Sequence, residues 1–397
     1  MWVRVGHENS VEVCDSVMRK ILSMYPEEGL MHRPVFEDAF INGYIDYENL
    51  AKESRVIFIP WQMFFLSLKN LEKELKQIED LRQYKFSAKF FTKRSAAGNI
   101  TSKRIIDRLI RLQNFVVSNY DLSKNGFCGL LKNKTKEQGV KDILDFFDLD
   151  IKDFRSKSKE YAFEYLMNQV SSKNINISRG VLRGGVLPQI QGINSVYRNT
   201  SGFVIKDECI PFIFLPDEVN PDEVAGRRIY TLLYLIACIG LGDYNFFIES
   251  DFKASVLKAQ GLDDLKHNIV SELLLPSEVT EKLKKTEITK VTIDSLASRY
   301  KMTPTAVVVT LRKRGVIRTK DEYGSLLPEP YKPQLRKIKM RHAKIATSVK
   351  KFCGERAFDF VNIGIAGKTL NSSQAQYLIF GRIRKKDYKE YCSQLDL

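Results

Sequence analysis

Residues 202–205 (GFVI), 210–215 (IPFIFL) and 227–241 (RRIYTLLYLIACIGL) form the stretch of sequence that decides the fold. The first two are short runs of β-branched and aromatic residues bounded by turn residues, which predicts strands of a small antiparallel sheet. The third is apolar on every side of a helix, as expected of a helix buried in a core. Helical periodicity dominates the rest of the chain, so the predicted fold class is α+β and mainly helical, with the sheet in its central part.

The composition is that of a globular, basic protein. Its 397 residues are enough for two or three domains, and 44% of them are apolar, which excludes wholesale disorder. Lysine and arginine number 63 against 48 acidic residues, giving a net charge of +15. Such a balance favours a polyanionic partner, and DNA is the one we expect.

The cysteines and the longest apolar run indicate the cellular compartment of the protein. The six cysteines form no CxxC pair, so they predict neither a disulfide framework nor a zinc ribbon, and reduced thiols in the cytoplasm are expected. The uncharged run at residues 229–242 is too short to cross a bilayer core of about 30 Å. We therefore expect a cytoplasmic protein without a membrane partner.

The order of elements around the central helix resembles the ImmA/IrrE family of metallopeptidases. Glycine-punctuated strands precede a helix that begins with Arg227-Arg228, and a second helix ends in the sequence ELLLP at residues 272–276. The resemblance spans residues 180–320 and implies a zincin-like central domain. In that family the double-arginine helix continues through Thr-Leu into HExxH, whose two histidines bind Zn²⁺ while its glutamate activates the zinc-bound water.

The residues that carry this chemistry in the family are replaced here. Tyr234 stands at the position of the first histidine, Leu235 at that of the glutamate and Cys238 at that of the second histidine. Because an aliphatic side chain cannot take a proton from water, the resemblance implies a pseudopeptidase with no catalytic residue and no metal cofactor. Packing is the favoured explanation of Cys238, since cysteine is among the most often buried residues.

The alternative is a rebuilt zinc site at Cys238, Asp263 and His267, which are all metal-ligand types. Without a gap, Asp263 falls at the position that the resemblance gives to the family's third, acidic ligand, and Asp264 falls there if the register shifts by one residue. His267 follows one helical turn later, on the same face of the same predicted helix.

The N-terminal part resembles the XRE-type helix-turn-helix that precedes the peptidase domain in many members of the family. Residues 44–52 (YIDYENLAK) and 59–65 (IPWQMFF) are similar to the end of that module and its linker, whereas residues 10–35 lack a clear turn between two helices. The resemblance implies either a DNA-binding module or a decayed one that packs. Residues 68–81 (LKNLEKELKQIEDL) then predict an amphipathic helix.

Residues 292–317 carry a better-formed helix-turn-helix pattern. A turn at residues 300–302 precedes Thr303 as N-cap and Pro304 at the first helical position, and Gly315 ends the second helix. In a DNA-binding protein the second helix enters the major groove. In the resembled family this segment often closes the peptidase domain as a helical support, so both roles stay open. The candidate DNA contacts of this helix are Thr303, Thr305, Arg312 and Arg314.

Two further segments concentrate positive charge. Residues 85–111 carry eight lysines and arginines against one acid, with phenylalanines among them, and residues 331–351 carry eight with no acid. Such residues neutralise phosphates and stack on bases. The alternatives are a basic helix face whose phenylalanines are buried, and an acidic protein partner. The candidate nucleic-acid contacts of these segments are Lys93, Arg94, Lys103, Arg104, Arg336, Lys337, Lys339, Arg341 and Lys344.

Together these patterns predict five segments and a regulatory function. The segments are an N-terminal helical module (1–120), a helical connector (121–179), the degenerate peptidase domain (180–290), the helix-turn-helix with its basic helix (291–351) and a C-terminal helical unit (352–397). We expect a non-catalytic regulator of a bacterial mobile element such as a phage, or of a defence or stress response, which binds DNA or a repressor-like protein. An active metallopeptidase with the altered zinc site, and an interaction module for an acidic protein, are the alternatives.

Overall fold

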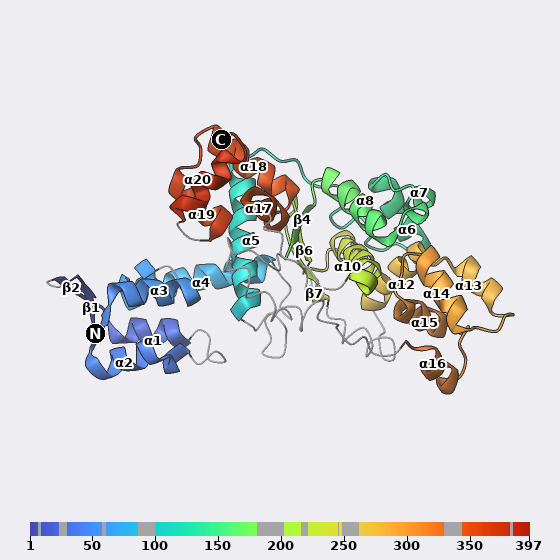
Figure 1. Cartoon of the computed structure of the whole chain (residues 1–397), viewed down its shortest axis with the longest axis horizontal. Coiled ribbons are helices and arrows are strands. Elements are labelled where there is room, and N and C mark those ends of the chain that lie inside the picture. Colours follow the sequence, from blue (N-terminus) through green and yellow to red (C-terminus); the bar gives the residue numbers. More distant parts are fainter. Residues whose placement is uncertain are drawn as a thin grey trace. The chain divides into compact units, whose positions relative to one another are not determined.

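The computed structural model describes residues 1–6, 9–23, 30–57, 61–85, 100–180, 202–215, 221–244, 246–247, 262–328, 344–381 and 384–397 (Figure 1). The chain forms two compact units, Met1–Ile105 and Ile106–Leu397. Most of the described residues lie in helices and two small sheets supply the strands, so the mainly helical α+β class is confirmed. Within these residues, no helix combines the length and the apolar character that a membrane span requires.

The N-terminal unit packs helices against a three-stranded sheet of order β2-β1-β3. Strand β1 is antiparallel to β2 and parallel to β3, and Val3 and Ile45 lie opposite each other in the core of the unit. The prediction of a purely helical module is therefore wrong in this respect. The sequence did not reveal the strands because three or four residues are too few to show a clear alternation of apolar and polar residues. The elements are β1 (Trp2–Val5), β2 (Asn9–Glu12), α1 (Asp15–Ser23), η2 (Leu30–His32), α2 (Pro34–Asn42), β3 (Tyr44–Asp46), α3 (Tyr47–Ile57), η3 (Trp61–Phe65) and α4 (Leu68–Lys85).

The segment that resembles the end of an XRE-type module forms β3, the first part of α3 and the 3₁₀ turn η3. The turn η3 has five residues and buries Met63 and Phe64 in the core of the unit. The amphipathic helix predicted after it is confirmed as α4.

The second unit contains the remaining elements. Its first helix, α5, begins at the border between the two units, so the first unit ends at Ile105, fifteen residues before the predicted border at residue 120. The predicted border after residue 351 falls inside α17. The elements are α5 (Ile100–Asn119), α6 (Lys136–Phe146), α7 (Ile151–Ser156), α8 (Lys159–Ser172), β4 (Asn176–Arg179), β5 (Gly202–Ile205), β6 (Phe212–Leu215), α10 (Pro221–Leu241), β7 (Phe246–Phe247), α12 (Leu262–Leu274), α13 (Ser277–Leu283), α14 (Lys290–Arg299), α15 (Pro304–Lys313), α16 (Lys320–Leu326), α17 (Ile345–Cys353), α18 (Glu355–Ala366), α19 (Ser372–Phe380) and α20 (Lys385–Ser393).

The sheet of this unit has four strands in the order β4-β6-β5-β7. Strands β5 and β6 pair antiparallel as predicted, and β7 pairs antiparallel with β5. Strand β4 pairs parallel with β6, with Asn176 opposite Phe212, so the sheet is mixed and the prediction of an antiparallel sheet is wrong in this respect. Parallel strands need a long connection, and such non-local pairing leaves no trace in the local pattern.

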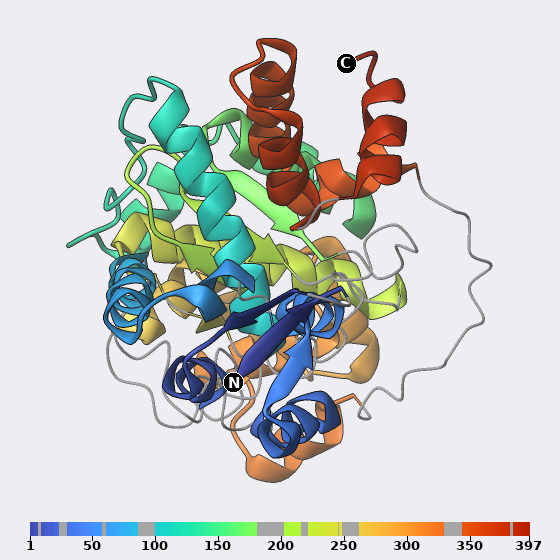
Figure 2. The same cartoon turned by 90° about the vertical axis from the view of Figure 1, so that its left-hand side faces the viewer.

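Helices cover both faces of this sheet (Figures 1 and 2). Ile177 of β4 lies in the core that α8 and α10 share, whereas Asn176 and Ser178 donate side-chain hydrogen bonds to the carbonyl oxygen of Cys353 at the end of α17. Because successive strand residues point to opposite faces, α8 and α10 lie on one side and the turn between α17 and α18 on the other. The sheet is the middle layer of the unit.

The predicted helix-turn-helix is confirmed as α14 and α15, and it is part of the same core. Thr303 caps α15 by accepting a hydrogen bond from the Ala306 N–H, and Pro304 takes the first helical position. At Gly226 in α10, a Cβ atom would lie 2.9 Å from the Met302 carbonyl group, so the turn before α15 touches the α10 backbone. The second helix of the motif is buried from Ala306 to Leu311.

Candidate functional site

The helix that resembles the peptidase helix, α10, lies against the sheet in the core of the second unit. Tyr234, Leu235 and Cys238 are buried in it, with exposed fractions of 4%, 0% and 0%. Leu235 faces the sheet, since a Cβ atom on Gly202 of β5 would lie 2.8 Å from Leu235 Cδ1. An aliphatic contact between helix and strand therefore occupies the position that the resemblance assigns to the general base.

Helix α12 packs along α10 and brings His267 to Tyr234. The two ring centroids lie 4.7 Å apart with the planes tilted by 38°, and the Tyr230 hydroxyl lies 3.0 Å from His267 Nδ1. Lys266 of α12 pairs with Asp243 just beyond the end of α10, so the two helices run antiparallel. Position 263 lies one helical turn before His267. In the antiparallel pair of helices, this first turn of α12 therefore runs beside the turn of α10 that contains Cys238.

The electrostatics of this contact are those of a closed interior. Lys266 is fully buried, and its ammonium lies 5.4 Å from the centroid of the Tyr234 ring as well as in the Asp243 ion pair. A buried ammonium needs such a counter-charge because desolvation costs several kcal/mol. Burial raises the pKa of Tyr230 well above its usual range, more than the Ser271 hydrogen bond lowers it. The Tyr230 phenol is therefore protonated at neutral pH and can donate to His267 Nδ1.

These contacts do not fit a catalytic zinc ion at the family's positions. Of the three replaced residues, Cys238 alone is a usual zinc ligand, Tyr234 packs on the His267 ring, and Leu235 offers no base. The side chain of Asp263 lies outside the described residues. Among the side chains that are described, no group of three His, Cys, Asp or Glu residues could hold a metal ion.

The candidate DNA contacts on α15 make internal interactions. Thr303 is buried as the cap of the helix, and Thr305 is half-buried. Arg312 donates to the Ile317 carbonyl oxygen at 3.0 Å. Arg314 forms an ion pair with Glu272 at 3.0 Å and donates to the Leu275 carbonyl oxygen at 2.6 Å. Arg314 thus ties α15 to the end of α12, which favours the supporting role of this motif.

The two basic segments lie mostly outside the described residues. This holds for Lys93, Arg94, Arg336, Lys337, Lys339 and Arg341. The side chains of Lys103 and Arg104 in α5 are not described either, whereas Lys344, the residue before α17, is exposed. The helix α17 that follows buries its apolar side against the sheet and the neighbouring helices.

One cation of the first basic segment, Arg108 of α5, is an internal residue. Its guanidinium donates to the Ile379 carbonyl oxygen at 2.6 Å and lies over the Phe352 ring at 4.3 Å. Burial lowers the pKa of Arg108 to about 10, and the group is still charged at neutral pH. Arg108 therefore joins α5 to α17 and α19. At this position the structure agrees with the alternative interpretation, in which the basic segment is a helix packed on the core.

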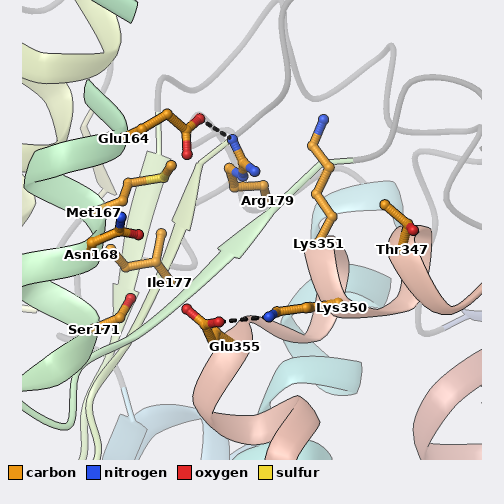
Figure 3. Close-up of a pocket in the computed structure, with 10 residues that line it drawn as sticks. All are labelled: Glu164, Met167, Asn168, Ser171, Ile177, Arg179, Thr347, Lys350, Lys351 and Glu355. Carbon is orange, nitrogen blue, oxygen red and sulfur yellow. Dashed lines mark hydrogen bonds and ion pairs between the residues drawn. The ribbon is translucent and has the colours of Figure 1, made fainter. Parts of the chain in front are cut away.

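Sequence patterns did not reveal a pocket beside β4, which Figure 3 shows in close-up. It has a volume of about 270 Å³ and lies between α8, β4, α17 and the start of α18. Glu164 and Arg179 form an ion pair at 3.4 Å on one wall, and Lys350 and Glu355 form one at 2.6 Å on the other. Its residues come from segments far apart in the chain, so no local motif announces it. They are Glu164, Met167, Asn168, Ser171, Ile177, Arg179, Thr347, Lys350, Lys351 and Glu355.

Comparison with known proteins gives no relative: no family model, no curated protein and no solved structure matches the chain.

Proposed function

We propose that this protein is a non-catalytic regulator built on an ImmA/IrrE-like scaffold, which acts by binding a repressor-like protein or DNA. The observation that carries the proposal is the packing of α10, where Tyr234, Leu235 and Cys238 are all buried in contacts within the core. The order of sheet, α10, antiparallel α12 and the α14–α15 support is also the order that the resemblance implies. The setting is a bacterium or a mobile element such as a phage.

The absence of a base at Leu235 supports a binding role over hydrolysis. A general base contributes about 10²–10⁴ to the rate of such a reaction, and an isobutyl group contributes none of it. Side chains also fill the surroundings, because Leu235 packs on β5 and Tyr234 packs on His267. A domain that keeps its scaffold and fills its centre with side chains can still recognise a protein on its outer surface.

DNA is supported as a partner by charge. The net charge is +15, and the segments at residues 85–111 and 331–351 hold a large share of the cations. The internal contacts of Thr303 and Arg314 direct the proposed DNA contact away from α15 and toward these segments. Lysines and arginines that neutralise phosphates give affinity without sequence readout. We therefore propose that DNA is bound through its backbone.

Metal analysis of the purified protein tests the loss of catalysis. We expect far less than one zinc per chain, the same content in the Cys238→Ser variant, and no cleavage of a repressor-like protein. One zinc per chain that disappears in Cys238→Ser, together with cleavage, would contradict the proposal.

That contrary outcome would establish the second candidate, an active metallopeptidase with zinc at Cys238, Asp263 and His267. One observation favours this candidate: the antiparallel register of α10 and α12 brings position 263 beside the Cys238 turn. Substituting Asp263 by Asn would then remove the metal as Cys238→Ser does.

A salt titration separates DNA from an acidic protein as the partner of the basic segments. Affinity for a random DNA duplex falls steeply with salt when phosphates are neutralised, with a slope of about −0.9 per phosphate contact on a logarithmic plot. We expect such a slope for the full chain. Binding to DNA that is absent at low salt would favour the interaction module for an acidic protein instead.

A further inference from the structure

The outer edge of β4 has no strand partner in the part of the chain that the structure describes, and Arg179 is its one half-buried residue beside three buried ones. Strand β4 is the last strand of the sheet order β4-β6-β5-β7, and it pairs with β6 alone. An unpaired strand edge presents a row of N–H and C=O groups that can pair with another extended chain. Proteins use this property to bind peptides by strand addition.

The register of the β4–β6 pair shows which backbone groups face outward. The Asn176 N–H donates to the Pro211 carbonyl oxygen and the Gly180 N–H donates to the Leu215 carbonyl oxygen, so the even-numbered residues of this stretch face β6. Along a strand, the backbone N–H and C=O groups of successive residues point to opposite sides. The N–H and C=O groups of Ile177 and Arg179 therefore point away from β6, toward the outer edge.

The pocket in Figure 3 lies along this edge. Ile177 and Arg179 line it, Met167 of α8 adds apolar surface, and α17 forms the opposite wall with Thr347. At about 3.3 Å per residue, the four residues of β4 present an edge of about 13 Å. A segment of three or four extended residues fits this length, and the volume of about 270 Å³ accommodates part of such a segment.

The charges around the groove select the kind of peptide. Three cations line it, Arg179, Lys350 and Lys351, and two carboxylates are paired with the first two of them, Glu164 with Arg179 and Glu355 with Lys350. The Glu164–Arg179 pair is long at 3.4 Å and its carboxylate is 53% exposed. Exposed pairs of this kind contribute little to stability, so an incoming carboxylate can replace Glu164 at Arg179 at little cost.

We propose that the edge of β4, between α8 and α17, binds an extended acidic segment of a partner protein by strand addition. The backbone groups of Ile177 and Arg179 pair with the segment, Met167 and Ile177 contact its apolar side chains, and the three cations attract its carboxylates. Leu235 of α10 contacts β5, and β6 lies between β5 and β4. The pocket at β4 is therefore distinct from the α10 site, and this proposal does not depend on the proposed loss of catalysis.

Fluorescence anisotropy with the full chain and labelled octapeptides tests the proposal. The probes are an alternating valine–glutamate peptide, the same peptide with N-methyl groups on alternate residues, and a valine–lysine peptide. We expect the first to bind and the other two to bind at least tenfold more weakly. Each lost backbone hydrogen bond reduces binding by several-fold, since its net free energy is about 1 kcal/mol.

Two variants with matched controls assign the binding to the groove. Thr347→Trp fills the groove from an exposed position of α17, and Ile363→Trp, at a 57% exposed position of α18 outside the groove, is its control. Arg179→Pro removes an outward N–H together with the charge, whereas Arg179→Gln removes the charge alone. We expect about tenfold weaker binding for Thr347→Trp and Arg179→Pro, a smaller loss for Arg179→Gln, and none for Ile363→Trp.

The proposal is overturned if the valine–glutamate peptide does not bind, if its N-methylated form or the lysine peptide binds equally well, or if Thr347→Trp leaves binding unchanged. Far-ultraviolet circular dichroism and the thermal midpoint of each variant show whether it is folded. Because Thr347 is exposed, its substitution keeps the test valid even where Arg179→Pro fails to fold.

Discussion

The ring of Tyr234 on α10 packs against the ring of His267 on α12, with 4.7 Å between their centroids. The contact joins the position that the ImmA/IrrE resemblance assigns to a zinc ligand with the helix that it assigns to the third ligand. The Tyr230 hydroxyl completes the contact at His267 Nδ1. The centre of the second unit is thus held by side-chain packing, and the predictions below address its stability and its partners.

We expect Tyr234→Ala to destabilise the second unit by about 3–5 kcal/mol, because truncating a buried aromatic side chain leaves a cavity and removes the ring contact. Urea unfolding monitored by circular dichroism measures the loss. The control is Tyr161→Ala, at a 73% exposed position of α8, for which a change within about 0.5 kcal/mol is expected. Equal effects at the two positions would show that Tyr234 is not a packing residue.

The buried ion pair of Lys266 and Asp243 predicts an asymmetric response to substitution. Asp243→Asn removes the counter-charge of an ammonium that is fully buried, at a cost of about 3–5 kcal/mol. Lys266→Met removes the buried charge itself and is expected to cost less. The exposed pair of Lys284 and Glu281 offers the control, since Lys284→Met changes stability by about 0–1 kcal/mol. A larger loss for Lys266→Met than for Asp243→Asn, measured by urea unfolding, would refute this account.

The lowered pKa of Glu272 leads us to expect that the stability of the protein depends on pH. Burial acts to raise the pKa of its carboxyl group, but hydrogen bonds from Ser277 and Lys136 and the charge of Arg314 outweigh it, and the net pKa is lowered. The unfolded chain therefore binds more protons at this site, and the stabilisation is present above the unfolded pKa of about 4.3 and is lost as the pH falls through the lower folded pKa.

The Glu272→Gln variant isolates this effect. At neutral pH we expect it to be less stable than the natural chain by about 1–3 kcal/mol, because charge-assisted hydrogen bonds to Ser277 and Arg314 are weakened. Urea unfolding of both proteins between about pH 7 and pH 3 should show this difference shrinking with acidification. A difference that stays constant over the whole range would mean that Glu272 is not ionised in the folded protein.

The basic segment at residues 331–351 predicts the salt dependence of DNA binding. Replacing Arg336, Lys337, Lys339 and Arg341 by glutamine should reduce the logarithmic salt slope by about 3–4, at about 0.9 per phosphate contact. Thr305→Ala on the half-buried start of α15 should leave the slope unchanged. If Thr305→Ala changes the salt slope and the fourfold variant does not, the helix-turn-helix and not the basic segment contacts DNA.

Much of the secondary structure could be predicted from the sequence, because its causes are local. The turn before Thr303 and the proline at position 304 begin α15, and an apolar run without charge forms the buried helix α10. The spacing of leucine and isoleucine three or four residues apart at residues 68–81 likewise predicts α4. In each case the hydrogen bonds and the periodicity that define the element lie within a few residues of one another.

The strands were harder to predict where they are short or pair with distant segments. The three-stranded sheet of the N-terminal unit has strands of three or four residues. The parallel pairing of β4 with β6 joins Asn176 to Phe212 across a long connection. A period of two cannot be established over so few residues, and local pattern carries no information on parallel or antiparallel direction.

The sequence by itself determined most of the helices and the basic balance of charge. The tertiary structure alone decided that Tyr234 meets His267, that Arg314 pairs with Glu272 inside the protein, and that β4, which among the described strands pairs only with β6, borders a pocket. The physical reason is range: helix formation depends on neighbours along the chain, whereas burial, ion pairing and strand order depend on which distant segments exclude water together.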